Sequence, residues 1–340
     1  MSSPACLIRK CLHYDDMMRP GNPAYISSSS TGDNRDPENA WPSFQIGDTT
    51  RPFQGYASST RNDGYFHYII TKRSFGENVT LKASFKGPNY AYSFFPGLMF
   101  AAQGWTEGYP AGYVGYLAVM GGMDRARFER FSWSVEAVLG TFSFPNVNTL
   151  SWLTMFASRG SGTSLFTFSY GVDGQYTSTC ADGSATWATG RMGVTYAYYP
   201  HLIQKFYVVK NTEDVDFWMK DYALGRQQKH TVLNLVNNAT GRVQVGSPTV
   251  PLWTINAYLP TMTTKKVIPG TGYYVENNET RLNRYMDNKD LVVVETPVWT
   301  TSGYITDLQG PKQKPGTNRG IGEFTFTLQE VRGCVSNSNG

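Results

Sequence analysis

Short segments in which apolar and polar residues alternate fill most of the chain from residue 64 onward. In the segment 78–87 every second residue is apolar, namely Val79, Leu81, Ala83 and Phe85. A period of two predicts a β-strand with one buried face. The segment 93–102 is a nearly continuous apolar run, which predicts a strand buried on both faces.

Further strand signals follow one another, separated by Gly, Pro and Asn. Up to residue 211 they occupy 64–75, 113–120, 131–140, 150–158, 164–174, 191–199 and 205–211. Beyond residue 229 they occupy 230–238, 241–245, 250–259, 272–277, 290–299 and 322–332. No repeat of fixed period is present, which argues against propellers and solenoids.

One segment, 213–228, has the features of a short helix. It starts with acidic residues and has Gly225 near its end. Its apolar residues are Val215, Trp218, Met219 and Tyr222. We therefore expect three parts: an extended, polar N-terminal arm over 1–45, a β-sandwich over 46–212, and a helix with further strands over 213–340. The last part is either a second small β domain or the completion of the first.

The composition favours an all-β protein. The 340 residues include 22 Tyr, 19 Phe and 8 Trp, which suit strands. Charged residues make up 16%, below the roughly 25% of an average soluble protein. The net charge of +4 is scattered, so we expect no specific binding of nucleic acid. No apolar stretch reaches the roughly 18 residues of a membrane span, and residues 1–20 lack the apolar core of an export signal. We expect no membrane partner.

Four segments give a recognisable order across residues 64–211. They are GENVTLKASF, GLMF, SWLTMFASRGSGTSLFTFSYGVDGQYTS and GRMGVTYAYYP. This order resembles concanavalin-like and laminin-G-like β-sandwich domains. Tyr170, Asp173 and Gly174 match a hairpin of these domains, and Asp-Gly is a tight-turn pair. Ser169 departs from the pattern because it precedes the tyrosine, whereas Gly193 matches a later glycine. The resemblance implies an antiparallel sandwich, and viral jelly rolls share this strand spacing.

The sequence contains no recognised catalytic motif. Glycoside hydrolysis needs two carboxyl groups roughly 5–10 Å apart, and Glu-x-Asp-x-x-Glu is absent. The nearest string, EDVD at 213–216, is interpreted as complementing the dipole of the predicted helix. The sequence has four histidines but no Gly-x-Ser-x-Gly motif, which would carry a serine nucleophile. The four cysteines lack zinc-site spacing; they are Cys6, Cys11, Cys180 and Cys334. We predict no catalytic residue, no metal and no cofactor.

The loop QGWTEGYPAGYVGY at 103–116 is the candidate binding site. It gathers four aromatic residues around glycines and a proline, namely Trp105, Tyr109, Tyr113 and Tyr116. Planar aromatic faces stack on sugar rings and anchor protein interfaces. An equally plain interpretation is that these rings cover the edge of the sandwich.

Three functions remain, and the first is favoured. It is a non-enzymatic virion protein, such as a phage tail or capsid component or a small-virus coat subunit. Such a protein would assemble into a homo-oligomer and contact a host glycan or surface receptor. The second function is an extracellular, lectin-like carbohydrate-binding module. The third is a polysaccharide-active glycoside hydrolase, which the fold would permit but the missing carboxylate pair opposes.

Overall fold

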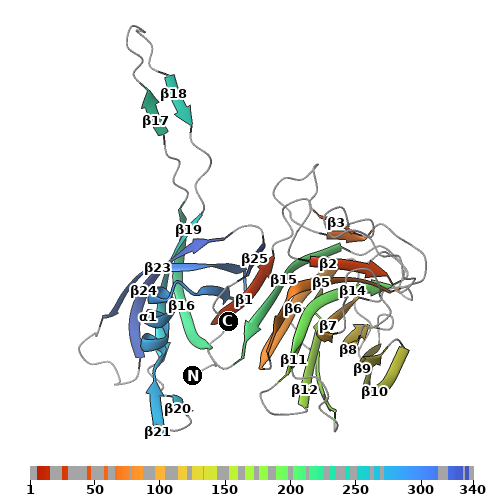
Figure 1. Ribbon diagram of the computed structural model, residues 1–340. Coiled ribbons are helices and arrows are strands. Elements are labelled where there is room, and N and C mark those ends of the chain that lie inside the picture. The colour runs from red at the N-terminus through yellow and green to blue at the C-terminus, as the bar shows by residue number, and fades with distance from the viewer. Residues whose placement is uncertain are drawn as a thin grey trace. The chain divides into compact units, whose positions relative to one another are not determined.

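The structure is a computed structural model of the whole chain (Figure 1). It describes residues 6–15, 25–29, 44–46, 57–59, 66–76, 78–86, 96–103, 114–120, 125–132, 134–143, 153–159, 165–171, 176–182, 189–197, 202–211, 214–225, 230–233, 242–245, 251–260, 264–268, 272–312, 321–331 and 334–336. Within these residues the protein is all-β and antiparallel, with one short helix.

The chain divides into two compact units. One comprises residues 12–212 and 333–340, and we call it the sandwich unit. The other comprises residues 1–11 and 213–332, and we call it the ring unit. Strand β1 (Cys6–Asp15) contributes its first half to the ring unit and its second half to the sandwich unit.

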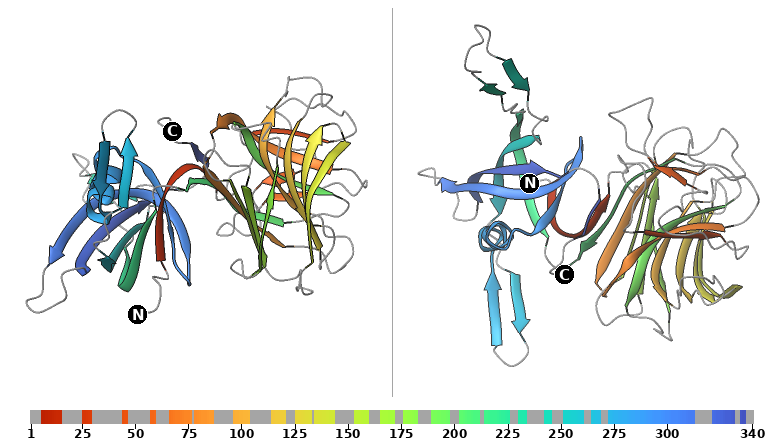
Figure 2. Two further views of the ribbon diagram at one scale, coloured as in Figure 1. Left: turned by 90° about the horizontal axis from the view of Figure 1, so that it is seen from below. Right: turned by 45° about the horizontal axis from the view of Figure 1, so that its top comes forward.

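The sandwich unit is built from two antiparallel sheets, which Figure 2 shows as stacked layers. One sheet has the order β13-β12-β11-β6-β15, with β4 beside β15 and β3 beside β4. Its strands are β3 (Phe44–Ile46), β4 (Ala57–Ser59), β6 (Val79–Lys86), β11 (Leu153–Arg159), β12 (Leu165–Gly171), β13 (Tyr176–Ala181) and β15 (Leu202–Lys210). In the same unit, β25 (Cys334–Ser336) pairs with residues 13–15 of β1.

The second sheet of the sandwich unit has the order β10-β9-β8-β7-β14-β5-β2. Its strands are β2 (Tyr25–Ser29), β5 (Phe66–Phe75), β7 (Gly97–Gln103), β8 (Val114–Met120), β9 (Arg125–Ser132), β10 (Ser134–Ser143) and β14 (Gly190–Ala197).

The predicted burial of two sandwich strands, β6 and β7, is confirmed. In β6 the predicted apolar set is buried, with relative exposures of 0–2% for Val79, Leu81, Ala83 and Phe85. In β7 the residues from Leu98 to Ala102 are all buried, as the continuous apolar run predicts. Strands β12 and β13 pair with Tyr170 opposite Tyr176. The predicted Asp173-Gly174 turn lies in their connection, outside the described residues.

The ring unit closes on itself. Its sheet has the order β1-β16-β19-β24-β23-β22, and β22 pairs again with β1. Ile8 of β1 thus faces Val215 on one neighbour and Val294 on the other. Closure of this kind removes the exposed edges that an open sheet would present. The strands are β16 (Val215–Gly225), β19 (Leu252–Pro260), β22 (Leu291–Glu295), β23 (Thr300–Lys312) and β24 (Ile321–Glu330).

Two hairpins interrupt this ring along the chain. Strands β17 (His230–Leu233) and β18 (Arg242–Val245) pair with each other, between β16 and β19 in the sequence. Strands β20 (Thr264–Ile268) and β21 (Gly272–Glu276) do the same between β19 and the helix. Each hairpin forms a separate two-stranded sheet.

Helix α1 (Asn278–Asp287) packs against the strands of the ring (Figure 2). Its Leu282 and Tyr285 are fully buried in the core of the ring unit. The Asn277 side chain caps it by accepting a 2.7 Å hydrogen bond from the Thr280 backbone N–H. This helix was not predicted from the sequence, although an Asn cap followed by Glu279 is a usual start signal.

The predicted helix at 213–228 is wrong, because this segment is strand β16. Val215 and Phe217 point into the core of the ring unit while Asp216 is exposed. The segment therefore satisfies a period of two as well as a helical one, and pairing with β1 and β19 decides between them.

The N-terminal segment also differs from the expected polar arm. Residues 6–15 form the mostly buried strand β1, in which the Cys6 and Cys11 side chains are buried. A central strand needs buried side chains, and CLIRKCLHYD supplies Ile8, Leu12 and Tyr14.

Candidate functional site

The predicted binding residues fall largely outside the part of the chain that the structure describes. This applies to Trp105, Tyr109 and Tyr113. Tyr116 lies in β8, opposite Phe100 of β7 and Arg130 of β9, but its side chain is not among those described. The aromatic-loop site therefore stays a prediction.

A cluster of three aromatic side chains in the ring unit is the candidate site. Tyr222, Trp253 and Trp299 form this aromatic triad. The Trp253 and Trp299 ring centroids are 4.5 Å apart with planes tilted by 33°. Tyr222 lies 5.7 Å from Trp253 and 5.6 Å from Trp299. Tyr222 is 44% exposed, and both tryptophans are half-buried against the core. The two tryptophans of the triad thus pack against the core, and Tyr222 is exposed to solvent.

The strand register places two members of the triad on the core face. Tyr222 lies directly opposite Ile255, which is fully buried, and opposite residues of an antiparallel pair share a face. Trp253 is two residues before Ile255 and so lies on the same face. The two rings therefore continue the core of the ring unit toward one end of β16 and β19.

The third ring comes from a tight turn. Trp299 ends the connection between β22 and β23. The Thr296 hydroxyl accepts hydrogen bonds from the backbone N–H groups of Trp299 and Val298, at 2.9 and 3.3 Å, and donates one to the Trp299 carbonyl at 2.8 Å. The Thr296 backbone N–H donates to the same carbonyl at 2.9 Å. These bonds fix the turn, and with it the Trp299 backbone.

The indole N–H groups of the two tryptophans differ in their hydrogen bonding. The Trp253 Nε1–H donates a 2.8 Å hydrogen bond to the Glu330 carboxylate at the end of β24. The Trp299 Nε1 is buried and has no hydrogen-bond partner. Glu330 is the one acid hydrogen-bonded to the triad among the described residues.

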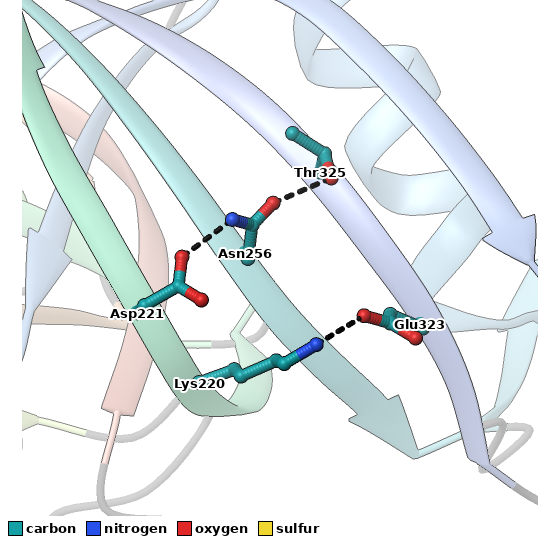
Figure 3. A network of polar contacts seen from close by, with 5 residues as sticks. All are labelled: Lys220, Asp221, Asn256, Glu323 and Thr325. Carbon is teal, nitrogen blue, oxygen red and sulfur yellow. Dashed lines mark hydrogen bonds and ion pairs between the residues drawn. The ribbon is translucent and has the colours of Figure 1, made fainter.

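The opposite face of the same strands carries a polar network (Figure 3). Asn256 Nδ2 donates to the Asp221 carboxylate at 2.5 Å, and Thr325 Oγ1 donates to Asn256 Oδ1 at 2.6 Å. These three residues stand in one cross-strand row of β16, β19 and β24. Beside them, Lys220 Nζ and Glu323 Oε1 are 2.9 Å apart. The hydrogen bond that Lys220 Nζ donates to the Glu323 carboxylate raises the pKa of the Lys220 ammonium. One face of these strands is thus aromatic and the other polar.

The acidic segment singled out in the sequence lies elsewhere in the ring unit. The Asp214 carboxylate is 3.5 Å from Arg9 Nε, and the Asp214 carbonyl accepts a hydrogen bond from Arg281 Nη1 of helix α1. Burial raises the pKa of the Asp214 carboxyl to about 6, against the opposing effect of Arg9. The proposed dipole role of this segment is wrong, because no helix starts there. Its contacts instead connect β1, β16 and α1.

Two arginines of β9 form ion pairs with acids in the sandwich unit. Arg127 Nη2 lies 2.8 Å from Glu129 Oε1, and Arg130 Nη1 lies 2.9 Å from Asp182 Oδ1. Within the described residues no group of three or more metal-ligating side chains gathers. In the same residues, no helix has the length and apolar character that crossing a bilayer requires.

Comparisons with known proteins find distant similarity to solved structures. No family model and no curated protein sequence matches the chain. Among solved structures, the carbohydrate-binding module CBM66 from Bacillus subtilis is 14% identical, with a TM-score of 0.39, over 54% of this chain and 95% of that one. A galectin-like-fold protein of unknown function from Bacillus subtilis is 12% identical, with a TM-score of 0.44, over 59% and 96%. The legume lectin-like domain from Entamoeba histolytica is 11% identical, with a TM-score of 0.39, over 55% and 90%. The two antiparallel sheets of the sandwich unit by themselves define a β-sandwich.

Proposed function

We propose that this chain is a non-enzymatic carbohydrate-binding protein and that the aromatic triad receives a sugar ring. The observation that carries the proposal is the exposure of Tyr222 beside two tryptophans whose ring centroids are 4.5 Å apart. Sugar rings present apolar C–H faces that stack on aromatic rings, and rings held in place lose little conformational freedom on binding. Tyr222 offers the accessible surface, while contacts with Trp253 and Trp299 hold its ring in place.

The polar groups around the triad suit recognition of hydroxyl groups. Glu330 is held by the Trp253 Nε1–H through one carboxylate oxygen. A carboxylate has further lone pairs that accept hydrogen bonds, as sugar hydroxyls require. A binding site of this kind combines a mostly apolar surface with a few placed polar groups.

The same geometry favours binding over hydrolysis. Cleavage of a glycosidic bond needs a carboxylic acid and a carboxylate facing each other across the bond. Within the described residues, Glu330 alone is hydrogen-bonded to the triad, and Glu323 lies with the polar network on the outer face of β24. Among the described residues, the triad therefore lacks the second carboxylate that a glycoside hydrolase would need.

A glycan array with the purified full chain tests the proposal. We expect binding to a restricted set of glycans, and Tyr222→Ala to lower the affinity for the best of them about tenfold, because one stacking contact contributes about 1.4 kcal/mol. Tyr222→Phe keeps the ring and serves as the matched control, with affinity within about twofold. An array without binding, or equal binding by Tyr222→Ala, would overturn the proposal.

A second candidate function is that of a self-assembling structural subunit, with a virion as the proposed setting. The observation that favours it is the pair of hairpins, β17–β18 and β20–β21, which pair within themselves and with no other described strand. Isolated two-stranded hairpins are marginally stable in water. Their stability would therefore come from a neighbouring subunit. Light scattering of the purified chain tests this function, since a strict monomer at all concentrations would contradict it.

A further inference from the structure

We infer that Leu224 makes the aromatic triad selective for sugars that carry a methyl group, such as 6-deoxyhexoses and N-acetylated hexosamines. The inference rests on the first proposed function, sugar binding by the triad, and names the class of sugar that this site takes. It adds one contact to the stacking on Tyr222, namely an aliphatic side chain against a methyl group of the ligand.

Leu224 lies beside two members of the triad. Along β16 it follows Tyr222 by two residues, so both side chains are on one face of the strand. Across the sheet it stands directly opposite Trp253 of β19, and opposite residues of an antiparallel pair have Cβ atoms about 4.5–5.5 Å apart. From Asp221 to Gly225 this pairing runs without a register shift. Leu224 is therefore an aliphatic neighbour of the aromatic rings.

Leu224 is exposed, although it is apolar and lies on the core face of β16. It is 44% exposed, like Tyr222, whereas Ile255 on the same face is fully buried. A third exposed apolar side chain, Val298, directly precedes Trp299 in its turn. Exposed apolar groups gathered at one position indicate an interaction surface. A ligand that covers Leu224 gains free energy in proportion to the apolar area that it removes from water.

The surroundings of Trp253 have an apolar side and a polar side. Strand β19 lies between β16 and β24 in the sheet. On the β16 side Trp253 has Leu224 opposite it, and on the β24 side its Nε1–H donates to Glu330. The Glu330 carboxylate accepts hydrogen bonds from hydroxyl groups, whereas the Leu224 side chain has no polar atom. A ligand that fits both sides presents hydroxyl groups at one edge and an apolar group at another.

An unsubstituted hexose does not match this arrangement. A hydroxyl group placed against Leu224 would lose contact with water without gaining a hydrogen bond, which costs free energy. In a 6-deoxyhexose a methyl group replaces the hydroxymethyl group, and in an N-acetylated hexosamine the acetyl group supplies a methyl group. Either methyl group would cover Leu224 favourably. The chemistry that the site selects is thus the methyl group, whichever of these two positions supplies it.

Two matched pairs of sugars isolate the methyl group. L-fucose and L-galactose differ only at C6, where fucose has a methyl group and galactose a hydroxymethyl group. N-acetylglucosamine and N-formylglucosamine differ only by the methyl group of the acetyl. Isothermal titration calorimetry of the purified full chain gives the four affinities. In at least one pair we expect the methyl-bearing sugar to bind about fourfold more tightly, the factor that corresponds to burying one methyl group. The pair that shows the preference identifies the position of the methyl group.

Substitutions assign the preference to Leu224. Leu224→Ala should weaken binding of the methyl-bearing sugar about fourfold and leave its partner within about twofold, so that the preference disappears. Leu224→Met keeps a similar apolar volume and should retain the preference. Tyr222→Ala should weaken both members of a pair equally, because both stack on its ring. Val138→Ala is the control at an exposed apolar strand residue of the sandwich unit and should change neither affinity.

The possible failures are distinguishable. A chain that binds no sugar, in calorimetry or on the glycan array, refutes the first proposed function and the inference with it. Equal affinities within both pairs, or binding confined to sugars without a methyl group, overturn the inference and leave sugar binding standing. An equal loss of both members of a pair in Leu224→Ala would limit Leu224 to a structural role and also overturn the inference.

Discussion

The ring of Trp299 lies edge-on to the ring of Tyr222, with centroids 5.6 Å apart and planes at 69°. Tyr222 belongs to β16, whereas Trp299 ends the turn between β22 and β23. In the described residues the two elements are joined through β1, which pairs with both. The aromatic contact is a second link between these two elements. The triad therefore combines a packing role with an exposed surface.

The unequal hydrogen bonding of the two tryptophans predicts unequal costs of the same substitution. Trp253→Phe removes the donor to the Glu330 carboxylate, and hydrogen bonds to charged groups contribute about 1.5–3 kcal/mol. Trp299→Phe removes a buried N–H that has no partner, so its loss offsets part of the lost packing. In urea unfolding followed by circular dichroism, Trp253→Phe should be the more destabilising by at least about 1 kcal/mol. Equal costs would contradict the assigned bond.

The backbone of β23 passes very close to that of β24 at Gly303. A Cβ added there would lie 2.2 Å from the Gln329 carbonyl oxygen, which no rotamer change can relieve. Gly303→Ala should therefore lower the free energy of unfolding by about 3 kcal/mol or more. The matched control is Gly225→Ala, whose Cβ would meet its nearest atom at an ordinary 3.7 Å. The control should change stability by less than about 1 kcal/mol, and thermal unfolding of both variants checks the pair.

Asp214 should make the ring unit less stable as the pH rises. Burial raises the pKa of its carboxyl from about 3.8 to about 6 in the folded state. The folded form thus binds this proton more tightly than the unfolded form, so the stabilisation is complete below pH 4 and is lost as the pH passes 6. The side chain is 32% exposed, so we expect about 1–2 kcal/mol. The measurement is the difference between the urea midpoints at pH 4.5 and pH 7. Asp214→Asn should show a smaller difference than the wild type, because it lacks this carboxyl.

His13 should make the sandwich unit less stable as the pH falls. It is 1% exposed and lies against Phe75 and Phe206. Burial, with a smaller contribution from the Arg73 charge, lowers its pKa to about 3. Its neutral form is thus favoured on folding, and the stabilisation is complete above pH 6.5 and is lost as the pH falls toward 3. The loss amounts to at most about 5 kcal/mol. His13→Gln should unfold in acid with a smaller slope, and an unchanged acid transition would contradict the assignment.

Much of the sandwich unit was predictable because its strands are locally unambiguous. In β6, polar and apolar residues alternate without exception from Leu81 to Lys86, and burial follows the alternation. In β7, the continuous apolar run has no exposed face to assign. In both strands the local pattern and the final burial agree, so each could be predicted before any pairing was known.

The ring unit was predicted less well because its signals are ambiguous or distant. The segment from Val215 to Tyr222 fits two periods, and the acidic start favoured the helical one. The true helix is only ten residues long, and its Asn277 cap stands directly after a strand signal. The aromatic triad joins residues 222, 253 and 299. No local pattern links positions so far apart, and their likeness in type is the single signal that the sequence offered.

The sequence by itself determined the all-β class, the buried faces of β6 and β7 and the scarcity of catalytic motifs. These properties follow from side-chain chemistry at a period of two and from the residue types present. The tertiary structure alone decided that β16 is a strand, that β1 completes a closed ring, and that three distant aromatic rings meet. Each of these depends on long-range pairing, in which hydrogen bonds and burial from separate segments outweigh the local preference of any one of them.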